Sequence, residues 1–65
     1  MWDAAQIKKL RQRLGITQEA LAHRLGVTLV TVNRWENGHV KPTGLSVAML
    51  DGVKKKLDEA KGNET

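Results

Sequence analysis

Residues 17–42 read TQEALAHRLGVTLVTVNRWENGHVKP, and this stretch decides the fold. Thr17 and Thr28 each precede a run of apolar residues at helical spacing, and a threonine in that place caps a helix N-terminus. Gly26 lies between the two runs, where a tight turn needs a residue that accepts a positive φ angle. The stretch therefore predicts two short helices that meet at a closely packed corner.

The side chains of this corner suit close packing. Ala22 is small where the two helices would cross, and no proline interrupts either helix. Three of the four residues at 29–32 are β-branched, which by itself favours a strand. The cap before them and the Asn37-Gly38 stop after them favour a helix instead. The residues expected to anchor the corner in a shared core are Leu21, Leu25, Val27, Val32 and Trp35.

Helical periodicity continues on both sides of the corner. Residues 3–14 have an N-terminal Asp cap and apolar positions at helical spacing, and Gly15 follows as an expected C-cap. After Pro42, an i+4 stripe predicts a last helix in which Asp51-Gly52 would introduce a break. The residues of that stripe are Leu45, Met49, Val53 and Leu57.

These elements predict an all-α fold of four to five helices with no strand. We expect one domain over residues 1–65, folded over residues 1–60, with a flexible tail at residues 61–65. No apolar run approaches the roughly 18 residues of a membrane span, and the start is not a signal peptide. We therefore expect a cytoplasmic protein that has no contact with a membrane.

Residue types needed for catalysis or metal binding are sparse. The chain has no cysteine, and its two histidines, His23 and His39, have no cysteine or carboxylate close by at ligand spacing. No nucleophile–base pair, paired carboxylate or Gly-rich phosphate loop occurs at usable spacing. We expect no enzymatic activity, no cofactor and no metal.

Charge supplies the first positive indication of function. The net charge is +4 and the sequence pI is about 9.9. The whole excess lies in residues 1–41, because residues 42–65 carry equal numbers of acidic and basic side chains. A basic domain of this kind is typical of nucleic-acid binders, although a solvated basic surface without a partner gives the same numbers.

The compound pattern in residues 17–42 resembles that of one family. The pieces Thr-Gln-Glu-x-Leu-Ala, Leu-Gly-Val, Val-x-x-Trp-Glu-x-Gly and x-x-Pro, preceded by the helix that includes Ile7, resemble the lambda-repressor and Cro-like helix-turn-helix family, also called the xenobiotic-response-element type. The resemblance covers about residues 5–50. It implies a sequence-specific regulator of transcription, more commonly a repressor, that inserts the helix at about 28–37 into the major groove of double-stranded DNA.

The resemblance also implies which residues read bases. Arg34 is the strongest candidate, because a guanidinium can donate two hydrogen bonds to guanine O6 and N7; its alternative is a solvated charge or a partner for Glu36. Leu29 or Val30 would contact thymine methyl groups, unless Leu29 packs back on the preceding helix. Asn33 would bond a base edge or a phosphate. The complete predicted set is Thr28, Leu29, Val30, Thr31, Asn33 and Arg34.

Phosphate contacts are expected on either side of the base-reading helix. Gln18 lies in the first turn of its helix, where free N–H groups and the helix dipole favour an anion. The loop after the base-reading helix supplies further polar side chains, and the first helix supplies one cation. The predicted phosphate set is Arg11, Thr17, Gln18, Asn37, His39 and Lys41.

Three further points concern partners and the two tryptophans. Trp35 is expected in the core, whereas the role of Trp2 is left open. Val47 and Leu50 form a second apolar set on the last helix, and we expect them to pair two copies as a homodimer on two half-sites. The alternative function is a DNA-binding antitoxin whose main partner is a toxin protein.

Overall fold

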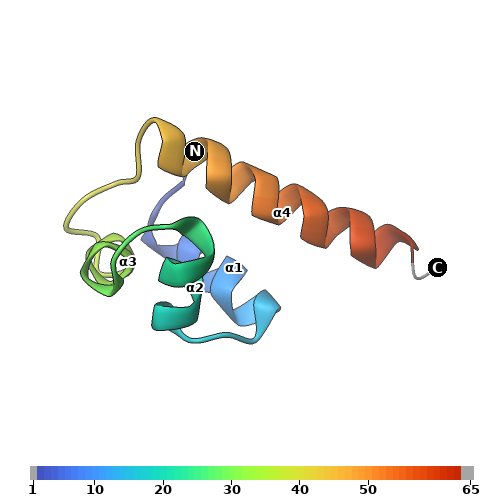
Figure 1. Ribbon diagram of the computed structural model, residues 1–65, viewed down its shortest axis with the longest axis horizontal. Coiled ribbons are helices and arrows are strands. Elements are labelled where there is room, and N and C mark those ends of the chain that lie inside the picture. The colour runs from blue at the N-terminus through green and yellow to red at the C-terminus, as the bar shows by residue number, and fades with distance from the viewer. Residues whose placement is uncertain (1, 64–65) are drawn as a thin grey trace.

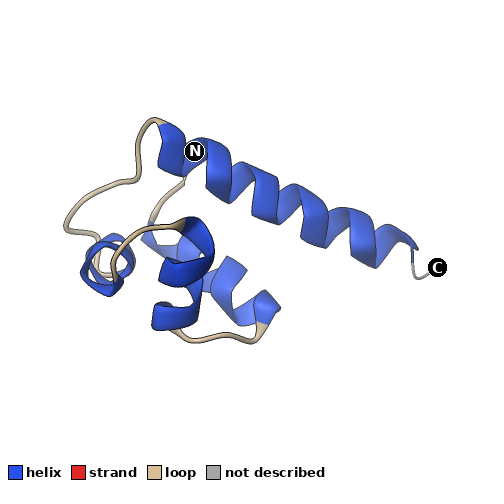
Figure 2. Cartoon of the chain, viewed as in Figure 1, coloured by secondary structure: helices blue, strands red, loops and turns tan. Residues whose placement is uncertain are grey.

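Four helices form the part of the chain that the structure describes. The structure is a computed structural model. It describes the backbone of residues 2–63 and the side chains of residues 2–60. The helices are α1 (Ala4–Leu14), α2 (Gln18–Leu25), α3 (Leu29–Glu36) and α4 (Leu45–Asn63). No strand occurs within residues 2–63 (Figure 2), so the all-α class is confirmed.

Short polar side chains begin the first three helices, as the sequence predicts. The Asp3 carboxylate accepts from the backbone N–H of Gln6 at 2.8 Å, and the Gln6 side chain accepts from the Asp3 N–H at 3.1 Å. Thr17 and Thr28 cap α2 and α3 in the same sense, each accepting a backbone N–H three residues on. These contacts satisfy N–H groups that a helix start leaves without partners.

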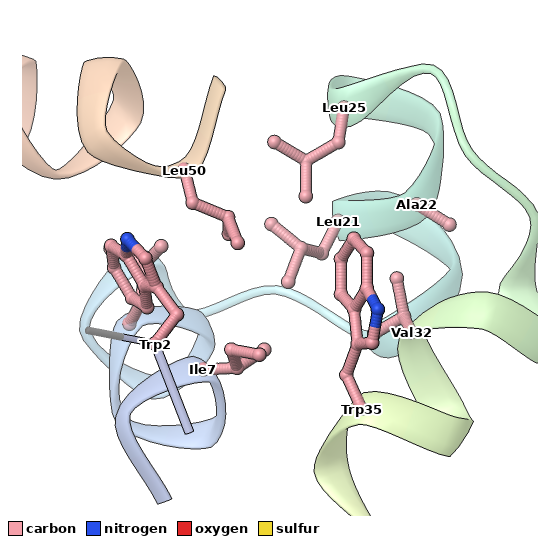
Figure 3. Close-up of a cluster of buried hydrophobic side chains, with 9 residues drawn as sticks. Trp2, Ile7, Leu21, Ala22, Leu25, Val32, Trp35 and Leu50 are labelled. Atoms are coloured by element: carbon pink, nitrogen blue, oxygen red, sulfur yellow. The ribbon is translucent and has the colours of Figure 1, made fainter. Parts of the chain in front are cut away.

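The turn between α2 and α3 is tight because Gly26 adopts a left-handed conformation, with φ of 72°. That conformation is strained for residues with a Cβ atom, so glycine keeps the turn short. The α2–α3 pair then packs on α1 around a common core. The core residues are Trp2, Ile7, Leu10, Leu21, Ala22, Leu25, Val32, Trp35 and Leu50. Figure 3 shows Trp35 beside Leu21 and Val32, and its burial confirms the expected core position.

The predicted inward stripe of α4 is confirmed at Met49, Val53 and Leu57, which pack against the core, and is wrong at Leu45. Leu50 is fully buried, whereas Leu45, the first residue of the predicted inward stripe, is 76% exposed. The two lie about 140° apart around a helix of about 100° per residue, so they cannot both face the core. Val47 is partly buried against the same core. The prediction that Val47 and Leu50 form a dimer surface is therefore wrong for Leu50, which points inward between Trp2 and Leu25 (Figure 3).

The structure defines the position of Trp2, whose role the sequence left open. Its indole is buried, and its Nε1 donates a hydrogen bond to Asp51 Oδ1 at 2.7 Å. This contact ties the start of the chain to the middle of α4, which runs along one side of the other helices and extends past them (Figure 1). The expected break at Asp51-Gly52 is wrong, because α4 continues through both residues.

The end of α4 also differs from the expected one. The helix continues to Asn63, beyond the expected limit of residue 60. Residues 64 and 65 of the expected tail lie outside the described residues. None of the described helices is both long enough and apolar enough to cross a membrane.

Two leucines of α4 provide a matched test of its register. We expect Leu50→Ala to lower the free energy of unfolding by about 2–5 kcal/mol, because it removes fully buried atoms and leaves a cavity. Leu45→Ala, the same change on the exposed face, should cost less than about 0.5 kcal/mol. Urea unfolding of both variants measures this difference, and equal losses would contradict the placement of Leu50 inside the core and Leu45 outside it.

Candidate nucleic-acid interface

The front of α3 is exposed, with apolar and cationic side chains side by side. Leu29 and Val30 are 44% and 64% exposed, although neighbouring Val32 is fully buried. Leu29 is therefore not buried against α2. Thr28 and Thr31 lie at the same end, and their hydroxyl groups are hydrogen-bonded at 2.9 Å. Isolated exposed apolar residues are common on proteins, but two consecutive ones on a short helix give it a methyl-rich front.

Arg34 lies on the exposed side of α3 in the next turn. Glu36, its alternative partner, forms its ion pair with Arg11 instead. Within residues 2–60, no hydrogen bond or ion pair engages the Arg34 side chain. Its guanidinium is therefore available to an external acceptor.

Arg11 and Glu36 form a two-point contact between α1 and α3. Arg11 Nε donates to Glu36 Oε2 at 2.7 Å, and its second terminal nitrogen donates to Glu36 Oε1 at 3.0 Å. Arg11 also donates to the backbone carbonyl of Ile16 at 3.2 Å. The Glu36 side chain is only 2% exposed and that of Arg11 21%. The guanidinium predicted to bind phosphate is thus engaged within the fold.

The ion pair shifts the ionisation of both groups toward their charged forms. Burial raises the pKa of Glu36, but hydrogen bonds from Arg11 and Gln18 and the charges of Arg11 and Lys8 outweigh it, so the net pKa is lowered. The hydrogen bond to Glu36 raises the pKa of Arg11 against the opposing effect of burial. Glu36 is therefore a buried carboxylate that stays ionised at neutral pH.

Three carboxamide side chains form a line of hydrogen bonds that begins at this carboxylate. Gln18 Nε2 donates to Glu36 Oε1 at 3.2 Å, and Asn33 Nδ2 donates to Gln18 Oε1 at 3.2 Å. Asn37 Nδ2 donates to Asn33 Oδ1 at 3.0 Å. We call Gln18, Asn33 and Asn37 the amide line. It joins the start of α2 to the end of α3, and it brings together three of the predicted site residues.

The remaining predicted phosphate residues lie close to the amide line in the sequence. Thr17 is exposed and uses its hydroxyl to cap α2. His39 and Lys41 are exposed in the loop between α3 and α4, and the backbone N–H of His39 donates to the Arg34 carbonyl at 3.0 Å. The loop therefore starts directly beside the last turn of α3.

Sequence reasoning missed the roles of Glu36 and Lys8. Glu36 lies four residues after buried Val32, and Arg11 lies four residues after buried Ile7, so each follows an inward position on its own helix. A carboxylate in such a position needs a cation, and that rule was the available signal. Lys8 is exposed, and its charge lowers the pKa of Glu36, so it adds a cation on this side of α1.

Within the described residues, no group of three or more His, Cys, Asp or Glu side chains is placed to hold a metal ion. The contacts available to a ligand on this surface are N–H donors, hydroxyl groups, methyl groups and cations.

The corner of α2 and α3, with a buried anchor and an exposed second helix, defines the helix-turn-helix class of DNA-binding domains. A sequence profile described as helix-turn-helix matches residues 7–50, which is most of the chain. The chain belongs to this family, in its lambda-repressor and Cro-like form. The family is one of DNA-binding regulatory domains.

Two curated relatives share this segment. The chain is 44% identical over 52 residues to the type II methyltransferase M.SsoII of Shigella sonnei, with 74% of this chain and 14% of that protein covered. It is 37% identical over 49 residues to the propionyl-CoA carboxylase regulator of Cereibacter sphaeroides, with 75% of this chain and 10% of that protein covered. The chain thus spans a small part of these relatives. No solved structure gave a significant match.

The ion pair predicts how stability depends on pH. Because the pKa of Glu36 is lower in the folded protein than its ordinary value of 4.5, its contribution is present above that value and is lost as acid protonates the folded form. We expect Glu36→Gln to lower the melting temperature at pH 7, with the difference from the parent protein shrinking below about pH 4.5. Thermal unfolding between pH 3 and 7 measures this difference.

Glu59→Gln serves as the control for loss of one negative charge, because Glu59 is exposed on α4. It should leave the melting temperature at pH 7 nearly unchanged. A Glu36→Gln deficit of the same size at every pH would contradict the assignment of the effect to the ionised carboxylate.

Proposed function

We propose that the chain is a sequence-specific regulator of transcription that inserts α3 into the major groove and represses by occupying an operator. The observation that carries this proposal is the front of α3, where exposed Leu29 and Val30 lie near an Arg34 that no described residue engages. Solubility alone favours polar residues at such positions, so the methyl-rich front is better explained by a partner. The Cereibacter sphaeroides relative, named as a regulator, supports the same conclusion.

Each part of this front has a counterpart on a base edge. The Arg34 guanidinium matches the two acceptors of guanine, O6 and N7. Leu29 and Val30 match the C5-methyl group of thymine, while Thr28 and Thr31 offer both methyl and hydroxyl groups. The proposed operator therefore combines a guanine with at least one thymine in each half-site.

Phosphate contacts would hold α3 in register on both sides. Thr17 and Gln18 lie at the N-terminus of α2, where the helix dipole favours an anion. Asn37, His39 and Lys41 follow α3 and would reach the backbone on the other side of the groove. Arg11 contributes from within the fold by holding Glu36.

We further propose that two copies bind together. The eight residues of α3 span about 12 Å at roughly 1.5 Å per residue. One turn of DNA is about 34 Å, so a single copy reads only part of a turn, and a twofold pair would read two half-sites. Because Leu50 is buried, it does not contribute to the pairing surface.

The roles of base and phosphate contacts can be separated by two substitutions. We expect Arg34→Ala to relax the preference at one base pair by about 1–3 kcal/mol. Gln18→Ala should weaken all sequences by nearly the same factor, because a phosphate contact carries no base information. Selection of bound duplexes from a random library at a fixed salt concentration measures both effects.

Arg24→Ala is the matched control, because it removes the same charge from an exposed position at the far end of α2. It should leave the selected consensus unchanged. An unchanged consensus for Arg34→Ala as well would contradict its assignment as a base reader.

A further inference from the structure

The amide line has a chemical direction that follows from one residue. A carboxamide offers an NH2 group on one side and a carbonyl oxygen on the other, so a chain of carboxamides can run in either sense. In this structure all three run in the same sense, with each NH2 group toward Glu36. The direction of the amide line is determined at its Glu36 end, where Gln18 donates to the carboxylate.

An ionised carboxylate accepts hydrogen bonds and cannot donate them. Gln18 must therefore present its NH2 group to Glu36, which leaves its carbonyl oxygen toward Asn33. That oxygen requires the NH2 group of Asn33, and the Asn33 oxygen then requires the NH2 group of Asn37. The ionisation of one buried side chain thus determines the orientation of three others.

Arg11 keeps this end of the line in place. It donates to both oxygens of Glu36, and Glu36 Oε1 accepts from Arg11 and Gln18 together. The carboxylate can neither rotate freely nor be protonated easily while both contacts persist. The two contacts from Arg11 therefore make Glu36 a rigid start for the line.

The fixed direction decides which N–H of each amide remains free for a ligand. Each NH2 group uses one N–H in the line and retains a second. The line therefore holds three N–H donors in defined positions. Phosphate oxygens are acceptors, so these three donors suit the DNA backbone.

We propose that Glu36 is a positioning residue whose ionised carboxylate sets the direction of the amide line, so that Gln18, Asn33 and Asn37 each hold one N–H donor in a fixed place for a DNA phosphate. This inference rests on the proposed DNA-binding function for its ligand. The orientation itself is a property of the free protein, so the two can be tested separately.

The first experiment follows the side-chain NH2 groups of the free protein by nitrogen-edited NMR. In the parent protein, the two protons of each NH2 group should differ in chemical shift more than in a free amide, because one is hydrogen-bonded. Glu36→Gln introduces a group that can donate or accept, so the direction is no longer set. We expect the Asn33 and Asn37 signals to move toward free-amide values in that variant.

A compensating substitution separates direction from packing. Adding Gln18→Glu to Glu36→Gln places a carboxylate beside Asn33, which must again present its NH2 group. The Asn33 and Asn37 signals should then return toward their parent positions, whereas a general loosening of the fold would not be reversed. Failure of this rescue, in a variant whose backbone spectrum shows a folded protein, would overturn the proposal.

Asp58→Asn is the matched control for loss of an ion pair. Arg13 donates to Asp58 at 2.7 Å, in a contact between α1 and α4 that involves no residue of the amide line. The amide signals of Asn33 and Asn37 should stay unchanged in this variant. A change as large as that in Glu36→Gln would show that any loosening of α1 disturbs the line, and it would contradict the specific role of Glu36.

The second experiment measures binding to a duplex chosen by selection. We expect Glu36→Gln to weaken binding about fivefold to tenfold, the effect of roughly one hydrogen bond. In a Gln18→Ala background the line is already broken, so the same change should cost less than about twofold. An equal factor in both backgrounds would show that Glu36 does not act through Gln18.

The two experiments distinguish failure of the proposed function from failure of the positioning role of Glu36. If the parent protein does not bind duplex DNA at low salt, the proposed function is contradicted, whereas the NMR result still stands. Strong duplex binding, together with amide signals that ignore Glu36→Gln, would contradict the positioning role alone.

Discussion

The two-point ion pair of Arg11 with Glu36 is the contact on which the proposed DNA-binding surface depends. It joins α1 to α3 at 2.7 and 3.0 Å, and the Arg11 contact to the Ile16 carbonyl brings in the start of the α1–α2 connection. A carboxylate buried without a cation would be strongly destabilising, so the helices must keep the arrangement that preserves this pair. No buried side-chain nitrogen or oxygen in the described part of the chain lacks a hydrogen-bond partner.

The core and the exposed front of α3 have complementary tasks. Val32 and Trp35 bury one side of the helix against α1 and α2, which holds α3 rigidly. The other side carries Leu29, Val30 and Arg34, and the fold gives these side chains no internal partner that would hide them. A small domain thus supplies a rigid helix with an exposed front, and the pre-arranged side chains reduce the cost of ordering them on binding.

Local patterns predicted most of the fold. The caps at Thr17 and Thr28, the turn at Gly26 and the burial of Trp35 all follow from neighbours within a few residues, and the structure confirms them. On α4 the predicted stripe was wrong only at Leu45, because the core takes residues from both apolar sets of that helix, with Leu50 at its centre and Leu45 outside it. The contact of Trp2 with Asp51 and the pairing of Arg11 with Glu36 join residues distant in sequence, which periodicity alone does not reveal.

DNA recognition as we propose it requires that the front of α3 enter the major groove. Intermolecular NMR contacts in a complex with a selected duplex would show this directly. We expect contacts between the methyl groups of Leu29 or Val30 and thymine methyl protons, with shift changes centred on α3 and the start of α2. Changes confined to α4, with the α3 methyl signals unaltered in a fully bound complex, would contradict it.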